Sequence, residues 1–168
     1  MLNLNLVVED IEVKDVNKND VIKIYNSITK EKFFVGNKEY MNIEEVYDRF
    51  LEYYLTEGEF FAKFECEHKF IGFLRGRVEF KKSNKVWINC IHINKEYRNK
   101  GIGSKLIIKI IEFLKKTYDI KVFYTGILNE EKDNLRFWKK NGFCIERISK
   151  EFFDINEKKK DMLILVKQ

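Results

Sequence analysis

The sequence predicts an α+β domain built on a mixed, mostly antiparallel sheet. Hydrophobic residues alternate with polar ones at the N-terminus, which is typical of a half-buried strand. Two helical patterns follow, and then three strand patterns separated only by short polar turns, which favours antiparallel pairing. A helical pattern next lies between two further strand patterns, and a crossover of that kind joins parallel strands. The expected order is therefore β-α-α-β-β-β-α-β-α-β-β in one mixed sheet.

Helices are predicted where apolar residues recur three or four positions apart. The first follows a cap at Asn19 or Asp20, and the second carries an acidic face opposite its apolar one. The last ends before Gly142, because glycine commonly follows the final helical turn. The predicted helices cover residues 21–28, 43–55, 104–117 and 131–141.

Strands are predicted where short apolar or alternating runs end at polar turns. Residues 67–69 are expected to form the tight turn of a hairpin, and residues 81–85 a polar turn after it. Residues 156–160 should connect the last two strands, with their three lysines as a solvated tip rather than a binding patch. The predicted strands cover residues 2–9, 60–66, 70–80, 86–93, 121–126, 143–149 and 161–167.

The composition indicates one globular domain in a reducing compartment. The chain has 168 residues, of which 45% are hydrophobic and 35% are charged. Two His and three Cys without a Cys-x-x-Cys pair favour neither a metal site nor a disulfide framework, so the cysteines are expected to be reduced and mostly buried. The N-terminus does not resemble a signal peptide, and no apolar run reaches membrane-spanning length. We therefore expect a cytoplasmic protein.

The net charge of +5 hides an asymmetry between the two halves. Residues 1–80 hold 11 Lys/Arg and 16 Asp/Glu, whereas residues 81–168 hold 21 and 11. Two interpretations stay open at this point. The basic half meets a polyanion and the acidic half a cation, or the halves are simply solvated faces of opposite sign.

The most informative segment spans residues 94–103, Asn-Lys-Glu-Tyr-Arg-Asn-Lys-Gly-Ile-Gly, between a predicted strand and a predicted helix. The first N–H groups of a helix lack partners within the helix, and the dipole is positive there, so such an end binds phosphate. Gly101 and Gly103 allow close approach to the backbone, and Arg98 and Lys100 add positive charge. Neither a third glycine nor a Gly-Lys-Ser/Thr run is present, which argues against dinucleotide fingerprints and P-loops.

The run Arg98-Asn99-Lys100-Gly101-Ile102-Gly103 resembles the Arg/Gln-x-x-Gly-x-Gly/Ala pyrophosphate loop of the GNAT superfamily of acyl-CoA-dependent N-acyltransferases. Residues 137–143, Phe-Trp-Lys-Lys-Asn-Gly-Phe, are similar to the second signature of that family, an aromatic pair followed by Gly-Phe. The two motifs have the family's spacing and lie within its element order. The close resemblance covers residues 86–143.

The resemblance implies a single N-acetyltransferase domain over residues 1–168. Its sheet would have six to seven strands, with about four flanking helices and a central fourth and fifth strand that splay apart. Acyl-CoA would bind mainly to residues 86–143, and the acceptor mainly to residues 1–80.

The resemblance also implies how acetyl-CoA, the expected cosubstrate, is held; it implies no metal. The diphosphate would lie on backbone N–H groups of the loop, and the pantetheine amides would pair with main-chain groups beside a β-bulge. Asn134 and Arg98 also fit a surface role, and Phe137 fits a partial role in the core. The implied set is Ile91, Ile93, Arg98, Asn99, Lys100, Gly101, Ile102, Gly103, Ser104, Asn134, Phe137 and Lys140.

The chain departs from the family at both familiar acid–base positions. Trp138 stands where many members have a tyrosine acid, and an indole N–H donates a hydrogen bond but is not an acid at neutral pH. Asn89 stands near the position of the usual glutamate base. His92 is therefore the predicted catalytic residue, because the ordinary pKa of histidine suits a base at neutral pH.

Other chemical roles stay open. His92 also fits a strand position without a catalytic role, Glu79 and Tyr124 are further base or acid candidates, and positioning alone is a further possibility. An acyl-cysteine route through Cys90 or Cys144 is set aside, since neither has an evident activating partner.

The acceptor is expected to be a primary amine. The second helix region is acidic and aromatic, which favours a cationic acceptor. The carboxylates there would equally serve to keep that helix soluble. Two rival functions stay open: a catalytically weak acyl-CoA-binding module, and a nucleic-acid-binding domain that uses the basic half. Neither nucleic acid nor membrane is expected as a partner, and a homodimer is possible. The residues expected at the acceptor are Tyr40, Glu44, Glu45, Tyr47, Asp48, Glu52, Tyr53 and Tyr54.

Overall fold

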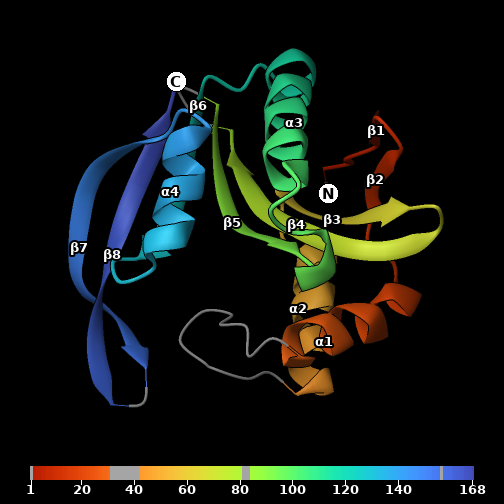
Figure 1. Cartoon of the computed structure of the whole chain (residues 1–168), viewed down its shortest axis with the longest axis horizontal. Helices are drawn as coiled ribbons and strands as arrows, with labels where there is room; N and C mark the ends of the chain where they lie inside the picture. Colours follow the sequence, from red (N-terminus) through yellow and green to blue (C-terminus); the bar gives the residue numbers. More distant parts are fainter. Residues whose placement is uncertain (1, 31–41, 81–83, 156) are drawn as a thin grey trace.

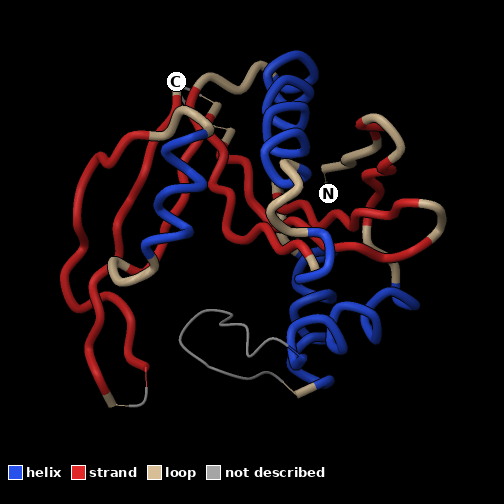
Figure 2. The backbone as a smooth tube through the Cα atoms, in the orientation of Figure 1, coloured by secondary structure: helices blue, strands red, loops and turns tan. Residues whose placement is uncertain are grey.

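The computed structural model describes residues 2–30, 42–80, 84–155 and 157–168, and these form one eight-stranded sheet flanked by helices (Figures 1 and 2). Tyr40, residues 81–83 and Asn156, which entered the sequence predictions, lie outside the described residues. In chain order the elements are β1 (Leu6–Val8), β2 (Ile11–Asp15), η1 (Lys18–Asp20), α1 (Val21–Lys30), α2 (Ile43–Leu55), β3 (Glu59–Cys66), β4 (Lys69–Glu79), β5 (Lys85–Ile93), η2 (Lys95–Tyr97), α3 (Ile102–Tyr118), β6 (Val122–Leu128), α4 (Lys132–Lys140), β7 (Cys144–Ile155) and β8 (Lys158–Lys167).

The strands lie in the order β1-β2-β3-β4-β5-β6-β8-β7, and every neighbouring pair is antiparallel except β5 and β6, which are parallel. The α+β class and the mostly antiparallel sheet are thus confirmed. The sheet has one strand more than the six or seven expected. Glu9 adopts a left-handed conformation with φ of 57°, so the chain turns back and Ile11–Asp15 pairs with Leu6–Val8 as a hairpin. The single strand predicted over residues 2–9 is therefore wrong in its extent.

The cap of the first helical segment lies earlier than predicted. Asn17, rather than Asn19 or Asp20, begins η1: its side chain accepts a hydrogen bond from the N–H of Asn19, and the Asp20 carboxylate accepts one from the N–H of Asn17. Asp20 is buried and also pairs with the Lys63 ammonium at 3.0 Å. These reciprocal bonds satisfy backbone N–H groups at the start of the helical segment, which explains why Asn17 is the cap.

The C-terminal hairpin is longer than predicted. Lys158–Lys160 belong to β8 rather than to a turn, and Lys159 and Lys160 pair with Asp154 and Glu130. Cys144 is exposed on β7, and Cys66 and Cys90 are half-buried, so the expectation of mostly buried thiols is wrong although all three are free. β7 is one of the two edge strands of the described sheet, and most of its side chains are exposed. None of the helices in the described ranges is long and apolar enough to span a bilayer.

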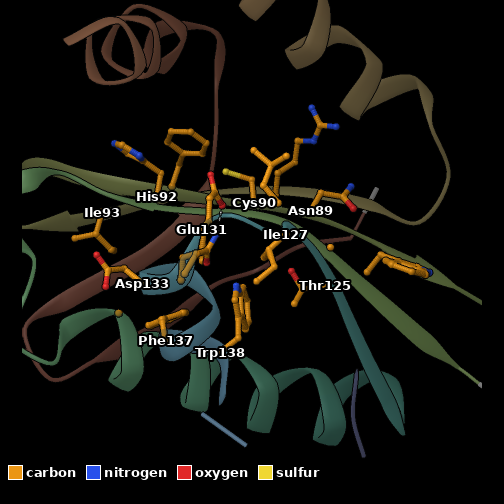
Figure 3. Close-up of a pocket in the computed structure, with 18 of the residues that line it drawn as sticks. Asn89, Cys90, His92, Ile93, Thr125, Ile127, Glu131, Asp133, Phe137 and Trp138 are labelled. Atoms are coloured by element: carbon orange, nitrogen blue, oxygen red, sulfur yellow. Dashed lines mark hydrogen bonds between the residues drawn. The ribbon is translucent and has the colours of Figure 1, made fainter. Parts of the chain in front are cut away.

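The helices form two layers around the sheet. Figure 3 shows α1 and α2 on one side of the strands and α3 and α4 on the other. Apolar side chains of α3 pack under the sheet, among them Leu106, Ile110 and Leu114. We call the side of the sheet under α1 and α2 the α1/α2 face, and the opposite side the α3/α4 face.

The central strands separate part of the way along their length. β5 and β6 pair only from Lys85↔Val122 to Ile88↔Thr125, and beyond those residues they diverge. On its other side β5 carries a bulge, because Gly76 pairs with Ile88 whereas Arg75 pairs with Cys90, which leaves Asn89 as the extra residue. The splayed central pair implied by the resemblance is therefore present, formed by β5 and β6.

Candidate functional site

A cleft of about 1180 Å³ opens where β5 and β6 diverge. It is lined from both faces of the sheet, and Figure 3 shows residues from α4 and from β5 converging on it. Every predicted site residue lines this cleft except Lys100, whose ammonium lies 5.7 Å from the centre of the Tyr97 ring. The predicted residues on the lining are Ile91, His92, Ile93, Arg98, Asn99, Gly101, Ile102, Gly103, Ser104, Asn134, Phe137 and Lys140.

The bulge at Asn89 decides which way the following side chains point. Arg75 and Gly76 are consecutive in β4 and so point to opposite faces, and their partners Cys90 and Ile88 do the same. In a regular strand, residues two positions apart, such as Ile88 and Cys90, share a face. The extra residue therefore turns Cys90 onto the α1/α2 face. Figure 3 shows His92 and Cys90 on that side, with Ile93 on the other.

The same segment presents backbone groups to the cleft. The N–H of Asn94 bonds to the carbonyl of Ile71 on β4, so the alternation of a strand directs the N–H and C=O groups of Ile91 and Ile93 away from β4 and towards β6. The hydroxyl of Thr125 donates a 3.0 Å hydrogen bond to the carbonyl of Ile88 where the strands part. The cleft is therefore edged by main chain, as a ligand with amide groups requires.

The start of α3 opens onto the cleft without a protein cap. Gly101 occupies the cap position in a left-handed conformation, with φ of 78°, and Asn99 is left-handed too, with φ of 60°. Among the described residues no side chain caps this helix, and its first turn holds no acidic residue. The N–H groups of residues 102–104 lack intrahelical partners by helix geometry, so this end is a suitable anion site.

Contacts between α3 and α4 hold that helix start in place. A Cβ added at Gly103 would lie 3.2 Å from the Phe137 ring and 3.9 Å from Ile93, so the glycine permits close packing as well as ligand approach. The side-chain amide of Asn141 donates to the Ser104 hydroxyl at 3.2 Å and to the carbonyl of Phe137 at 2.8 Å.

The charged and polar candidates have defined neighbours. Arg98 donates from Nε to the carbonyl of Ile93 at 2.6 Å, so it ties the loop to the end of β5. Asn134 donates to the Glu131 carboxylate at 2.9 Å near the start of α4. Lys140 is exposed and lines the cleft at the end of α4.

Hydrogen bonds around His92 indicate the tautomer of its neutral ring. Asn94 donates from Nδ2 to the carbonyl of Phe70 at 3.2 Å, which directs Oδ1 to the hydroxyl of Ser27. Ser27 donates its single proton to that Oδ1 at 2.5 Å, so its 2.9 Å contact with His92 Nε2 requires Nε2 to be the donor. The neutral His92 ring therefore carries its proton on Nε2 and its lone pair on Nδ1. The ring is buried and stacks on Phe73 at 5.2 Å.

The remaining candidates for a catalytic role differ in their surroundings. Trp138 is buried, packs edge-on to Phe143, and in Figure 3 directs its indole nitrogen towards the strands. Tyr124 stacks on Trp87 at 4.9 Å and donates a 3.4 Å hydrogen bond to Glu146, while Glu79 does not line the cleft. Desolvation raises the pKa of the Cys90 thiol to about 12, although the nearby Arg75 acts in the opposite direction, which disfavours a thiolate nucleophile.

The acidic and aromatic residues of α2 lie elsewhere than expected. Of α2, Val46 and Arg49 line the cleft, whereas Glu44, Tyr47 and Asp48 border a separate shallow groove. Glu45 caps α2 together with Asn42, Glu52 pairs with Arg49, and Tyr53 is buried. The helix turns these residues away because Val46, Phe50 and Tyr53 form its buried face.

Several organising residues were missed by the sequence reasoning. Asn141, Thr125 and Ser27 each connect elements that lie far apart in the chain. Only Asn141 carried a local signal, since it directly precedes the glycine that ends α4. Arg75, which lines the cleft from β4, carried none.

Residues 13–164 match the model of the acetyltransferase (GNAT) domain, so the chain belongs to the GNAT acetyltransferase family. Among curated relatives, a probable spermine N(1)-acetyltransferase of Bacillus subtilis subsp. natto (strain BEST195) is 31% identical over 65 residues. That segment covers 39% of this chain and 43% of the relative. The chain thus matches less than half of the length of that relative.

Solved structures share the fold at lower identity. The spermidine N-acetyltransferase from Vibrio cholerae, in complex with CoA and spermine, superposes with a TM-score of 0.76 at 17% identity, covering 94% of this chain and 95% of that one. Arabidopsis thaliana Naa50, in complex with the bisubstrate analogue CoA-Ac-MVNAL, has a TM-score of 0.73 at 22% identity, covering 95% and 99%. These similarities establish the fold.

Proposed function

We propose that the chain is an N-acetyltransferase that moves an acetyl group directly from acetyl-CoA to a primary amine of a small molecule or peptide. The observation that carries the proposal is the uncapped start of α3, which faces the cleft that begins at Asn89. Family membership supports the reaction class. The polyamine and peptide ligands named for similar proteins support an amine acceptor.

The residues present fit the diphosphate and the pantetheine arm of coenzyme A. The α3 start supplies N–H donors and lacks a carboxylate that would repel an anion, and Lys140 lines the same cleft. The main chain of Ile91 and the N–H of Ile93 face the divergence of the strands, where they can pair with amides, whereas the Ile93 carbonyl already accepts from Arg98. When bound, acetyl-CoA would supply an activated acyl group, and its sulfur would leave as a thiolate once the amine has attacked.

His92 is the base in this proposal. An alkylammonium must lose a proton before it attacks, and a neutral imidazole near the acyl site can take it. Because Ser27 holds the proton of the ring on Nε2, the lone pair on Nδ1 is the acceptor. Asn94 and Ser27 act as positioning residues, since they orient the ring without contacting the amine.

Two assays test the proposal. Thermal unfolding with CoA, acetyl-CoA or an oligonucleotide tests which ligand stabilises the fold, and thiol release over a broad panel of amines tests turnover. We expect stabilisation by both CoA compounds, none by the oligonucleotide, and thiol release with at least one amine. Stabilisation without release for any amine would favour the rival function of an acyl-CoA-binding module. Stabilisation by the oligonucleotide alone would contradict both functions.

A pair of variants tests the location of the diphosphate. Gly103→Glu places a carboxylate at the α3 start and should remove the CoA-induced shift while the fold persists. Ile108→Glu makes the same change in charge at an exposed position on the same helix and should keep the shift. A normal CoA shift in Gly103→Glu would contradict the assigned location.

A further inference from the structure

We propose that the acceptor carries an anionic group, a carboxylate or a phosphate, within a few bonds of its amine, and that Arg75 binds this group. The inference rests on the proposed function and specifies the acceptor class. An amino acid or a phosphorylated amine would meet this requirement, whereas a polyamine would not.

Arg75 lies on the acceptor side of the sheet, beside the proposed base. It is directly opposite Cys90, and two residues earlier on β4 Phe73 is directly opposite His92. Residues directly opposite in an antiparallel pair share a face, so Arg75, Phe73, Cys90 and His92 form one patch on the α1/α2 face. Arg75 and His92 are diagonal neighbours in this patch, a relation in which Cα atoms are about 7–8 Å apart. One small molecule can therefore contact both side chains.

The guanidinium of Arg75 has no counterion in the part of the chain that the structure describes. The side chain is half-buried, and its Nε is buried without a hydrogen-bond partner among the described residues. None of the ion pairs in the described ranges includes Arg75. A half-buried guanidinium is always charged and offers a planar set of donors, which matches a carboxylate or phosphate.

The other charges on the described lining do not supply this anion. Glu131 and Asp133 are the carboxylates there, both at the start of α4, and neither forms an ion pair with Arg75. Figure 3 shows the Glu131 carboxylate at the level of the strands, between His92 and Cys90, and Asp133 below the strands. Glu131 accepts from Asn134, and Asp133 pairs with Arg136 at 3.4 Å. On the α1/α2 face the lining adds Arg49 from α2, which pairs with Glu52 at 2.7 Å. Among the described lining residues, the Arg75 guanidinium is thus left without an anionic partner.

Matched acceptors test the inference. The probes are L-amino acids against their primary amides, O-phosphoethanolamine against ethanolamine, and spermidine, each with acetyl-CoA in the thiol-release assay. We expect the anionic member of the preferred pair to have a kcat/KM roughly 10- to 100-fold above its neutral counterpart, the usual range for a charge-assisted contact. The amino-acid and phosphoethanolamine arms distinguish a carboxylate from a phosphate.

Variants at two positions of β4 locate the effect. Arg75→Gln should lower kcat/KM for the anionic acceptor by that same factor, mainly through KM, and should leave the neutral counterpart unchanged. Arg75→Lys should have a kcat/KM for the anionic acceptor between those of the wild type and Arg75→Gln, because lysine keeps the charge but loses the planar donor set. Arg77→Gln is the control, since Arg77 is exposed on the same strand and does not line the cleft.

A binding measurement distinguishes a failure of this inference from a failure of the proposed function. Calorimetric titration of the acceptors into the CoA complex should show that anionic amines bind and that Arg75→Gln weakens them. Such binding without turnover would support the inference and contradict the proposed function. Turnover that favours spermidine or the neutral amides, or an equal loss for both acceptor types in Arg75→Gln, would overturn the inference and leave the proposed function standing.

Discussion

The side-chain amide of Asn141 donates a 3.2 Å hydrogen bond to the hydroxyl of Ser104, and this contact joins the end of α4 to the start of α3. Asn141 is buried, with 5% of its surface exposed, and its own carbonyl accepts from the Lys167 ammonium at 2.7 Å. The two helix ends that edge the cleft are therefore connected through one amide.

Asn141→Ala should lower the free energy of unfolding by about 1–3 kcal/mol, because it removes hydrogen bonds made by a buried amide. It should also weaken the CoA-induced thermal shift, since the α3 start loses a contact. Urea unfolding and thermal shift measure the two effects. Ser104→Ala and the double variant complete a cycle, and additive losses would show that the two side chains are not coupled.

Gly101→Ala should cost about 1–2 kcal/mol of stability, because the position requires a left-handed backbone. A Cβ there would meet no atom of the described residues within 4 Å, so the cost is conformational and not steric. Gly101→Asn should cost less, since asparagine tolerates this conformation. Urea unfolding of both variants measures the loss of stability, and equal losses for Gly101→Ala and Gly101→Asn would contradict this explanation.

Ser27→Ala should lower kcat about tenfold without changing KM for acetyl-CoA, because Nε2 of His92 loses its acceptor and the ring tautomer is no longer fixed. Nitrogen chemical shifts of the His92 ring report the tautomer directly. Ser27→Thr keeps the hydroxyl and should restore the wild-type shifts. Thr29→Ala is the control, because that hydroxyl lies on the same helix and bonds to the carbonyl of Tyr25. An Nε2–H tautomer that persists in Ser27→Ala would rule out this role for Ser27.

Cys90 should be alkylated last of the three cysteines at pH 8, and the exposed Cys144 first. Desolvation raises the pKa of Cys90 to about 12, so roughly one thiol in ten thousand is a thiolate at that pH. Its labelling should rise with pH as long as the protein stays folded. Peptide mapping after brief iodoacetamide treatment gives the order of labelling. Rapid modification of Cys90 would reopen the acyl-cysteine route.

Much of the loop that opens α3 could be predicted from the sequence because it is local. Residues 98–104 are contiguous, and the start of a helix after a glycine has the same donors in any fold. The helix over residues 43–55 was predicted to the residue for the same reason, since its apolar spacing lies within one segment. The hairpin of β1 and β2 was missed because it depends on the conformation of Glu9, a residue type without a strong turn signal.

By itself, the sequence determined the family, the order of most elements and the helix end that faces the cleft. Only the tertiary structure decided which side chains meet there. The extra residue at Asn89 turns His92 and Cys90 to the face that holds Ser27 and Arg75, and no local pattern encodes that turn. The physical reason is that side chains alternate along a strand, so one inserted residue exchanges the faces of the residues that follow it, compared with a regular strand.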